Sequence, residues 1–304
     1  MKQFFKLSFR RADASLVGYF RRHNFEFAKK VGYNRAQSTL KRYETVCRHL
    51  KDFINVEYGS DDILFKKLNL NFIDGFDIYL RHSLMLKPNT VWGYMTVFKH
   101  IVSLARNEGL LVRDPFCGYC NCGVRVDRGY LLESELKRVY CTRMPTRSME
   151  LVRDLFVFSA YTGISYSDLK RLKKGDVRRM FDGNLWLLFR RRKTNVECPV
   201  RLFDVPLAIM KKYDTLRDEV LFRVPSNFYC NSVLPKIMSL CGIDRKITFH
   251  AARHTFATLL LSKNVPIETV SRILGHRSIK TTQIYARITN EKLSIDMNRV
   301  KSLL

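Results

Sequence analysis

Two histidines, an arginine and a tyrosine near the end of the chain have the types and the spacing of a site that could act on a phosphate. His250 and Arg253 stand three residues apart in FHAARHTF, so a helix would place both on one face of its first turn. A helix N-terminus presents free N–H groups and a partial positive charge, so this turn could bind an anion. Taken alone, the pair fits an exposed first turn without a ligand slightly better.

Two later segments add to this pair at fixed distances. His276 directly follows Gly275 at the end of VPIETVSRILG, where a histidine commonly only caps a helix. Tyr285 lies nine residues further along, in SIKTTQIYARI, and a single tyrosine on a short helix is usually part of a core. The ordered set H-x-x-R, then G-H, then Y is far more specific than any of its members.

A tyrosine needs help to attack a phosphodiester, because a phenol with a pKa of about 10 is a weak nucleophile at neutral pH. Attack becomes possible when cations neutralise the phosphate and an acid protonates the leaving oxygen. Residues 189–195, FRRRKTN, carry such cations. We expect them to end a strand and to enter a hairpin turn at Thr194-Asn195.

Together these motifs resemble the tyrosine recombinases, the site-specific recombinases of the phage-integrase type. Residues 250–288 carry the strongest part of the resemblance, which extends over nearly the whole chain. It implies that Tyr285 becomes joined to the 3′ phosphate of a cut DNA strand and frees a 5′ hydroxyl. It also implies that Arg253 holds the non-bridging oxygens, that His250 exchanges a proton near the tyrosine, and that His276 donates a hydrogen bond to the phosphate.

The resemblance further identifies Lys193 as the general acid for the leaving 5′ oxygen. An Arg/Lys run on a hairpin is also typical of plain contacts with the DNA backbone. In the family, the reaction needs neither a metal nor ATP, because the phosphotyrosine keeps the bond energy for religation. We therefore expect no cofactor.

The stretch YTGISYSDLK, residues 161–170, departs from the family pattern. Most members carry T-G-L-R-x-x-E here, and that arginine is the second clamp on the phosphate. Ser165 stands in the place of the arginine, while Asp168 keeps the acidic position. The two predict a capping-box-like pair for the helix that follows. Loss of one charge-assisted contact would cost the transition state about 2–4 kcal/mol.

The missing cation leaves three alternatives: an inactive protein that only binds DNA, a slow enzyme with one arginine, or an enzyme in which another cation reaches the phosphate. We expect the third, with Arg191 as the replacement, because alternation along a strand would place it on the same face as Lys193. Arg190 and Arg192 would face the other way and contact DNA. Arg153 is a second candidate, although about 18 Å of straight helix separates it from the turn.

A serine at this place resembles the integrases of conjugative transposons and the related DNA invertases. That branch often has an additional N-terminal domain that binds arm sites. Since the chain begins close to its helical region, we expect no such domain, which favours a simple recombinase such as an invertase. The predicted function is a site-specific recombinase that integrates, excises or inverts DNA. A catalytically weakened DNA-binding regulator is the alternative, and a type IB topoisomerase is a weaker one.

The charge balance agrees with a DNA substrate. Lys and Arg total 54 against 28 Asp and Glu, which gives a net charge of +26 and a pI near 10.0. Such an excess repels itself unless a polyanion offsets it, so double-stranded DNA is the expected partner and an anionic membrane surface is the rival. No apolar run of about 18 residues spans a bilayer, and the N-terminus lacks a signal peptide. We therefore expect a cytoplasmic protein with eight reduced cysteines.

The first third of the chain must position DNA for this chemistry. Apolar residues at helical spacing predict four helices, over 14–32, 38–59, 71–84 and 90–110, with Ser38 as an N-cap and Gly59 as a stop. The bundle is basic throughout. The residues expected to contact DNA are Arg42, Arg48, Lys51, Lys87 and Lys99.

The predicted fold class is mainly α with a small β-sheet (α+β). A helical SAM-like core-binding domain (1–113) is followed by a linker (114–129), a tyrosine-recombinase catalytic domain (130–288) and a C-terminal tail (289–304). The linker contains three close cysteines, but a zinc site usually needs a second ligand pair at a matching spacing, so we expect no metal. These cysteines are Cys117, Cys120 and Cys122.

The tail has one apolar stripe at helical spacing, formed by Leu293, Met297, Val300 and Leu304. The stripe could pack on its own domain, or it could dock on the next protomer, as such tails do in the family. We expect the second, and with it a homotetramer assembled on two DNA sites through a Holliday-junction intermediate. Accessory DNA-bending proteins could assist this assembly.

Overall fold

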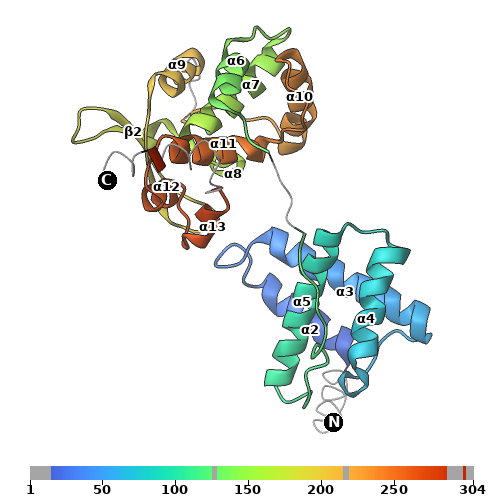
Figure 1. The fold of residues 1–304 in the computed structure, drawn as a ribbon. Coiled ribbons are helices and arrows are strands. Elements are labelled where there is room, and N and C mark those ends of the chain that lie inside the picture. The colour runs from blue at the N-terminus through green and yellow to red at the C-terminus, as the bar shows by residue number, and fades with distance from the viewer. Residues whose placement is uncertain (1–14, 125–128, 215–218, 286–296, 299–304) are drawn as a thin grey trace. The chain divides into compact units, whose positions relative to one another are not determined.

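The computed structural model describes residues 15–124, 129–214, 219–285 and 297–298. The chain divides into two compact units, with the boundary between residues 126 and 127 (Figure 1). In the described residues of the first unit the named elements are all helices, whereas the second unit combines helices with a small sheet. The predicted α+β class is therefore confirmed.

The first unit is a bundle built from helices α2 (Leu16–Ala28), α3 (Gln37–Tyr58), α4 (Leu70–Ile78) and α5 (Pro88–Asn107). A π-helical turn, η2 (Tyr79–Ser83), continues α4, and a short 3-10 turn, η1 (Phe65–Lys67), precedes it. The four predicted helices are present with shifted bounds. Gly59 ends α3 in the left-handed conformation as expected, whereas Ala36 rather than Ser38 is its N-cap.

The bundle has its own aromatic core. Phe72 and Phe76 on α4 and Phe98 on α5 are almost fully buried, and the rings of Phe76 and Phe98 meet edge to face at 5.6 Å. Burying one such side chain stabilises a fold by about 1.5–3 kcal/mol. The amphipathic helices of this unit therefore stabilise it without help from the second unit.

Much of the segment predicted as a linker is fixed to this bundle. Phe116 is buried, and the Tyr119 hydroxyl donates to Oδ1 of Asp77 at 2.6 Å. The side chain of Asn89 makes two hydrogen bonds of 2.8 Å with the backbone of Val124. The packed part of the bundle thus extends to residue 124, eleven residues beyond the predicted boundary at 113. Residues 125–128 lie outside the described part of the chain.

The three linker cysteines are exposed in this arrangement. Among the described residues, no group of three His, Cys, Asp or Glu side chains lies close enough together to hold a metal ion.

The second unit holds the remaining elements. Its helices are α6 (Glu133–Cys141), α7 (Arg147–Thr162), α8 (Tyr166–Leu169), α9 (Asp204–Tyr213), α10 (Asn227–Leu240), α11 (Phe249–Ser262), α12 (Ile267–Ile273) and α13 (Lys280–Gln283). A 3-10 turn, η3 (Lys174–Asp176), leads into strands β1 (Val177–Arg179), β2 (Leu185–Arg190) and β3 (Glu197–Arg201).

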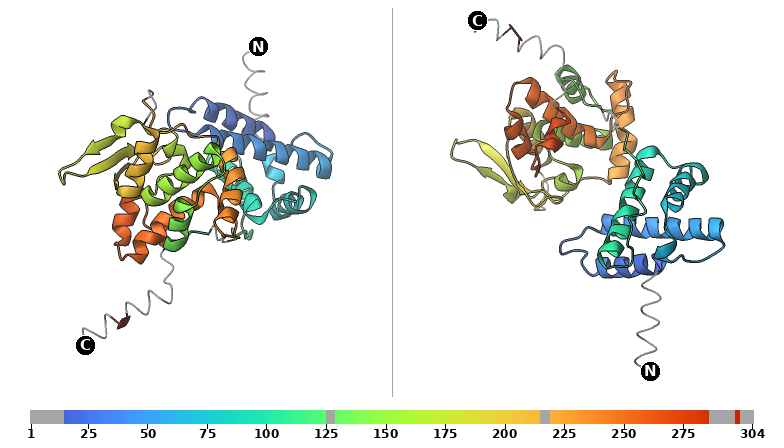
Figure 2. Two further views of the ribbon diagram at one scale, coloured as in Figure 1. Left: turned by 90° about the horizontal axis from the view of Figure 1, so that it is seen from above. Right: turned by 60° about the horizontal axis from the view of Figure 1, so that its bottom comes forward.

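The strands form one antiparallel sheet in the order β1-β2-β3, at one edge of the second unit (Figure 2). Leu187 of β2 is paired with Val177 of β1 and with Val200 of β3. The predicted hairpin is present, and Asn195 adopts a left-handed φ of 54° in its turn. Alternating burial along β2 fixes its register and therefore fixes where this turn begins.

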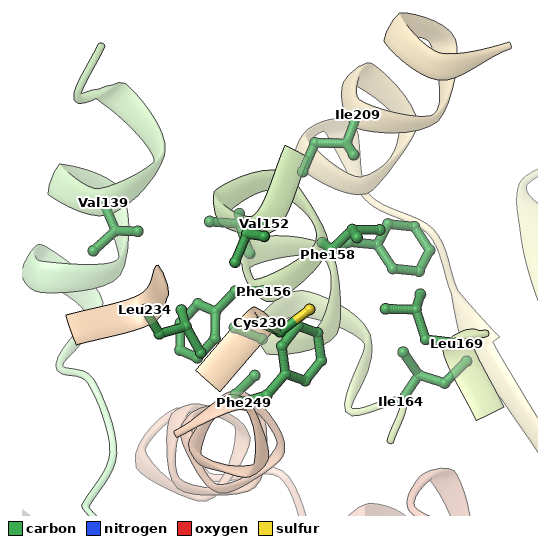
Figure 3. Packing of buried hydrophobic residues seen from close by; sticks show 14 of the residues in the cluster. Val139, Val152, Phe156, Phe158, Ile164, Leu169, Ile209, Cys230, Leu234 and Phe249 are labelled. Carbon is green, nitrogen blue, oxygen red and sulfur yellow. The ribbon is translucent and has the colours of Figure 1, made fainter. Parts of the chain in front are cut away.

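Helix α7 is the centre of the second unit's core. Its Phe156 and Phe158 are fully buried and lie among Phe249 of α11, Leu234 of α10 and Ile209 of α9 (Figure 3). A helix buried on most of its sides cannot shift without opening cavities, each of which would cost several kcal/mol. Because α7 is held in this way, the turn at its C-terminal end is a fixed platform for polar side chains.

No helix in the described part of the chain has both the length and the apolar character needed to cross a bilayer.

Candidate active site

A polar pocket lies where four segments far apart in the sequence meet in the second unit. They are the turn between α7 and α8, the hairpin turn after β2, and the first turns of α10 and α11. The pocket is lined by Ile164, Ser165, Tyr166, Ser167, Arg191, Lys193, Asn227, Asn231, Thr248, Phe249, His250 and Arg253. Four of the side chains singled out in the sequence as catalytic therefore share one cavity: two arginines, a lysine and a histidine.

Arg253 is the most deeply placed cation of the pocket, with 3% of its surface exposed. Its Nη1 donates to the carbonyl of Gly163 at 2.7 Å, and its Nη2 donates to the carbonyl of Leu274. These carbonyls end α7 and α12, where the helix dipole is negative and stabilises a cation. Burial lowers the pKa of Arg253 to about 10, so the guanidinium remains charged at neutral pH.

Gly163 is required for this contact. It adopts a left-handed φ of 70°, and a Cβ placed on it would lie 2.4 Å from Cδ1 of Phe256. Only glycine fits both the conformation and the space, so this glycine lets α11 approach the end of α7.

His276 lies beside Arg253 in a defined tautomer. The Nη2 of Arg253 is 2.9 Å from Nε2 of His276, and arginine can only donate, so Nε2 is the unprotonated nitrogen. The proton of a neutral ring is therefore on Nδ1, which donates to Oγ1 of Thr282 at 2.8 Å. Burial, followed by the charges of Arg253, Arg191 and Lys193, lowers the pKa of His276 to about 4. The imidazole is thus neutral at physiological pH.

Tyr285 lies in the turn after α13 rather than on the helix itself, which ends at Gln283. Its ring stacks on that of His276, with centroids 6.4 Å apart and planes 15° apart. It is 8% exposed and belongs to a small apolar cluster with Phe256 of α11 and Val270 of α12. The aromatic body of the tyrosine is therefore packed as a core side chain next to the phosphate-binding candidates.

His254 is a further residue of the site that was not predicted from the sequence, although it stands four residues after His250 on the same face of α11. Its ring meets that of His250 and that of Tyr285 edge to face, with centroids 4.9 Å apart in each case. His254 thus lies between the two residues. The i, i+4 spacing was the signal that could have identified it.

Arg191 lies in the pocket for a reason other than strand alternation. Strand β2 ends at Arg190, so the period of two does not extend to Arg191 and Lys193. Arg191 is 9% exposed, its Nη1 donates to the carbonyl of Gly275 at 3.3 Å, and its Nε is 3.7 Å from Oδ2 of Asp168. The start of the hairpin turn, held by these two partners, directs the guanidinium inward.

Ser165 and Asp168 interact, but not as the predicted capping box. Ser165 is the N-cap of α8, yet its hydroxyl donates to Oδ2 of Asp168 at 2.6 Å instead of accepting from the helix backbone. Asp168, 4% exposed, also accepts from the backbone N–H of Arg192 at 2.9 Å and is paired with Arg191. The acidic residue therefore ties the turn to the hairpin.

Gly275 makes room for Arg191. Its φ is +61°, and a Cβ there would lie 2.4 Å from Sγ of Cys198 and 2.7 Å from Cδ of Arg191. Its carbonyl accepts from Arg191 and from Oγ1 of Thr194 at 3.1 Å. The end of α12 thus binds both the hairpin and, through Leu274, Arg253.

Two models of known protein families match the chain. The model of the phage integrase SAM-like domain matches residues 15–121, and that of the phage integrase family matches residues 131–292, more than half of the chain. The chain belongs to the phage integrase family.

One curated relative and two solved structures align with most of this integrase-family chain. The tyrosine recombinase XerC of Halalkalibacterium halodurans is 23% identical in an alignment 289 residues long that covers 87% of this chain and 91% of the relative. The Tn1549 transposon integrase in complex with a circular intermediate DNA has a TM-score of 0.72 at 15% identity, covering 93% of this chain and 98% of that chain. A lambda integrase tetramer bound to a Holliday junction has a TM-score of 0.67 at 18% identity, covering 87% and 78%.

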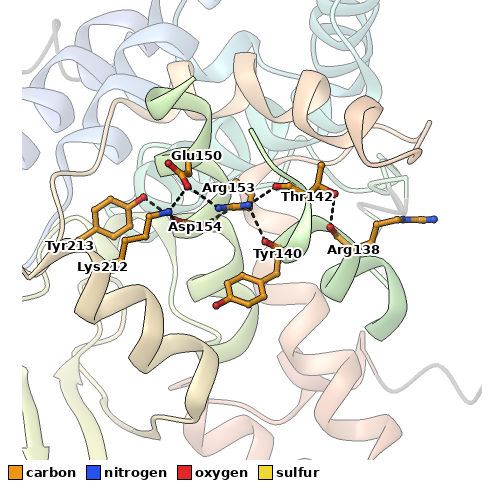
Figure 4. Close-up of polar contacts among 8 residues, drawn as sticks. All are labelled: Arg138, Tyr140, Thr142, Glu150, Arg153, Asp154, Lys212 and Tyr213. Carbon is orange, nitrogen blue, oxygen red and sulfur yellow. Dashed lines mark hydrogen bonds and ion pairs between the residues drawn. The ribbon is translucent and has the colours of Figure 1, made fainter. Parts of the chain in front are cut away.

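In this integrase-family structure Arg153 does not line the pocket. It is 7% exposed and is held by Asp154 at 2.6 Å and by the carbonyls of Tyr140 and Thr142 at 2.9 and 2.6 Å (Figure 4). Lys212 of α9 also bonds to Asp154 at 2.7 Å. Arg153, the second candidate for the replacement cation, therefore does not reach the turn at Ser165: its guanidinium joins α6 to α7, and Asp154 links both to α9.

The basic residues expected to contact DNA are distributed over the surface. Lys51 forms an ion pair with Asp61 at 3.2 Å, and Nζ of Lys99 lies over the ring of Phe116. Arg190 is 3.7 Å from Glu197. The exposed members of the set are Arg42, Arg48, Lys87, Lys99, Arg190 and Arg192.

The predicted docking stripe of the C-terminal tail falls almost wholly on residues 286–296 and 299–304, which lie outside the described part of the chain. Met297 is its only described member.

Proposed function

We infer that this protein is a tyrosine-type site-specific recombinase that cuts and rejoins double-stranded DNA with Tyr285 as the nucleophile. One observation carries the assignment of the site. Arg253 touches His276, and His276 stacks on Tyr285, so a cation, a hydrogen-bonding imidazole and a phenol form one continuous group beside the pocket. A phosphodiester bound there would contact all three.

The proposed reaction is a transfer of the phosphoryl group to Tyr285 and back. The phenol oxygen attacks phosphorus, and its proton passes to a base, for which His250 is the candidate in the pocket. The bond from phosphorus to the 5′ oxygen breaks, and Lys193 supplies the proton to that oxygen. Religation runs the same steps backwards on a new 5′ hydroxyl.

His276 has to change partners in this scheme. In the DNA-free protein its Nε2 accepts from Arg253, whereas the family role is to donate to the phosphate. A phosphate bound to Arg253 would replace the imidazole as the acceptor of that N–H. While Thr282 keeps the Nδ1 proton, the exposed lone pair on Nε2 would then have to take up a proton before His276 could donate to the phosphate.

We propose that Arg191 is the second clamp on the phosphate, in place of the arginine that Ser165 lacks. Three features support this. Arg191 lines the same pocket as Arg253, it is almost fully buried, and Asp168 and Gly275 orient it from two sides. Within the described residues its Nε makes no hydrogen bond, so a donor is available to an incoming oxygen.

The nucleophile is tested by Tyr285→Phe. We expect no covalent adduct with a nicked suicide substrate and no recombination, because the attacking oxygen is removed, while binding to the duplex stays within about twofold of wild type. An adduct at the wild-type rate in the phenylalanine variant would exclude Tyr285 as the nucleophile.

The second clamp is tested by Arg191→Ala and by rescue. We expect Arg191→Ala to lower the cleavage rate about 100- to 1,000-fold, the usual result of removing one charge-stabilising donor. Adding Ser165→Arg, which restores the arginine typical of the family, should recover most of that loss. Arg153→Ala is the matched control, because Arg153 is buried but lies in another network. If Ser165→Arg rescued Arg153→Ala and not Arg191→Ala, the clamp would belong to Arg153.

Assembly is proposed by analogy with the relatives. A lambda integrase of similar fold forms a tetramer on a Holliday junction. We propose the same assembly here on two DNA sites, with the tail at 289–304 docking on the next protomer and with accessory DNA-bending proteins as further partners. Because the proposed substrate is DNA inside the cell, we place this action in the cytoplasm. The serine at position 165 supports membership of the branch that contains conjugative-transposon integrases and invertases.

A further inference from the structure

Thr282 stands between the phosphate-binding candidates and the nucleophile, and none of the roles assigned so far includes it. It is the third residue of α13 and is fully buried, with 0% of its surface exposed. A polar side chain with no access to water must find its hydrogen-bond partner within the protein.

The hydroxyl of Thr282 bonds to His276, as its Oγ1 lies 2.8 Å from Nδ1 of the ring. Because Arg253 occupies the other ring nitrogen and can only donate, Thr282 is the acceptor for the Nδ1 proton. Arg253 and this hydroxyl together stabilise the tautomer in which Nε2 carries a lone pair.

The backbone of Thr282 bonds to the nucleophile. Its carbonyl accepts the N–H of Tyr285 at 3.0 Å, and its own N–H donates to the carbonyl of Ile279 at 2.7 Å. These two bonds close the single turn of α13 and the turn after it. A shift of the Thr282 side chain would consequently move the backbone that places Tyr285.

We propose that Thr282 is a positioning residue of the reaction, whose hydroxyl sets the tautomer of His276 and whose main chain sets the place of Tyr285. The proposal rests on the proposed role of Tyr285 as the nucleophile. Loss of the hydroxyl releases the imidazole from its orientation next to Arg253 and loosens the stack of His276 on Tyr285. The lowered pKa of His276 agrees with a ring held neutral in this position.

The test compares Thr282→Val, which keeps the shape and removes the hydroxyl, with Thr282→Ser, which keeps the hydroxyl. In the wild-type protein labelled with ¹⁵N-histidine and free of DNA, the ring nitrogens of His276 should show a protonated Nδ1 and an unprotonated Nε2. A His276→Gln spectrum assigns the signals. The serine variant should keep this pattern, and the valine variant should lose it.

Cleavage of a suicide substrate provides the second readout. We expect Thr282→Val to lower the cleavage rate about 10- to 100-fold, the effect typical of removing the partner that orients a functional histidine. Its affinity for the duplex should remain near that of wild type, and Thr282→Ser should cleave at close to the wild-type rate. If the valine variant does not fold, Thr282→Ala takes its place in both measurements.

Three results would overturn the proposal. The valine variant could keep the wild-type tautomer, it could change the tautomer and still cleave at the wild-type rate, or the serine variant could be as slow as the valine variant. The tautomer measurement needs no reaction. The tautomer result is therefore informative even if Tyr285→Phe shows that the proposed function is wrong. Failure of the proposal on Thr282 can thus be distinguished from failure of the proposed function.

Discussion

Two guanidinium groups with little access to water lie on the same pocket, which is unfavourable unless something offsets their repulsion. Arg253 and Arg191 are 3% and 9% exposed, and each lowers the pKa of nearby groups, including His276. Asp168 supplies the one carboxylate bonded to this pair among the described residues, and the remaining stabilisation comes from carbonyls at helix ends. A phosphodiester anion would supply the missing negative charge, which is consistent with the proposed role of these two arginines as clamps on the scissile phosphate.

The protonation of the single residue His276 makes the free energy of unfolding depend on pH. Its pKa is about 4 in the folded protein and 6.5 ordinarily, so the unfolded chain takes up the proton first as the pH falls. The contribution of His276 to the free energy of unfolding should be constant above pH 6.5 and should decrease between pH 6.5 and about 4. Because the ring is partly exposed, we expect a loss of about 1–2 kcal/mol rather than the full value of the shift.

Urea unfolding at pH 7.5 and at pH 4.5 measures this contribution when wild type is compared with His276→Gln. Other histidines with lowered pKa values, such as His23 and His49, are present in both proteins and cancel. The stability lost on acidification should be smaller in the glutamine variant, and equal losses would contradict the assignment.

The groups of the candidate site are positioned by the ends of helices and strands, and not by the faces of these elements. The C-terminal ends of α7 and α12 supply carbonyls to the two arginines, and the hairpin turn after β2 brings one of those arginines in. Glycines with positive φ, Gly163 and Gly275, make both ends possible. A substitution at one of these helix ends should therefore alter catalysis indirectly, by displacing an arginine that belongs to another element.

Gly275→Ala tests this coupling between elements. The new Cβ would meet Cys198 and Arg191, so we expect Arg191 to be displaced, the cleavage rate to fall at least tenfold and the free energy of unfolding to fall by about 1–3 kcal/mol. Gly183→Ala is the matched control: its φ is +72° but no atom lies within 4 Å of the added Cβ.

The control variant should lose about 1 kcal/mol of stability, from the backbone conformation alone, and should cleave normally. Suicide-substrate cleavage together with urea unfolding separates the two effects. Equal cleavage defects in both variants would mean that strain, not the contact with Arg191, is the cause.

At the scale of the whole molecule, the net charge of +26 determines how DNA is bound. Each of the two units has its own core, so each can present basic residues without relying on the other for stability. Contacts with phosphates release condensed counterions, and affinity for DNA should therefore fall steeply with salt.

The contribution of the helical bundle to DNA binding is tested by the triple variant Arg42→Gln, Arg48→Gln and Lys87→Gln. If all three contact phosphates, the slope of log K against log salt should decrease by about 2.7, or about 0.9 for each contact. Affinity should fall for specific and non-specific duplexes alike. Glu57→Gln, Asp61→Gln and Glu44→Gln change exposed acids of the same unit and form the opposite control, which should strengthen binding. An unchanged slope in the first variant would show that this surface does not touch the backbone.

Features that depend on local order along the chain could be predicted from the amino-acid sequence. Helical periodicity predicted the bundle and the helices of the second unit, and the turn residues predicted the hairpin, because these features are set by neighbours in sequence. The spacing of His250, Arg253, His276 and Tyr285 was sufficient to resemble the family to which the chain belongs. The prediction that Ser165 stands in the place of an arginine came from the same resemblance.

Which side chains contact one another in the site depends on long-range packing and could not be predicted from the sequence. Asp168 and Arg191 are paired because a buried α7 fixes one turn against another, and no local pattern contains that distance. The same packing places Arg153 in a different network, and it puts Thr282 and His254 against the rings of His276 and Tyr285. Long-range packing selects one of several arrangements that local preferences allow equally, so the identity of the second cation and the tautomer of His276 depend on the fold.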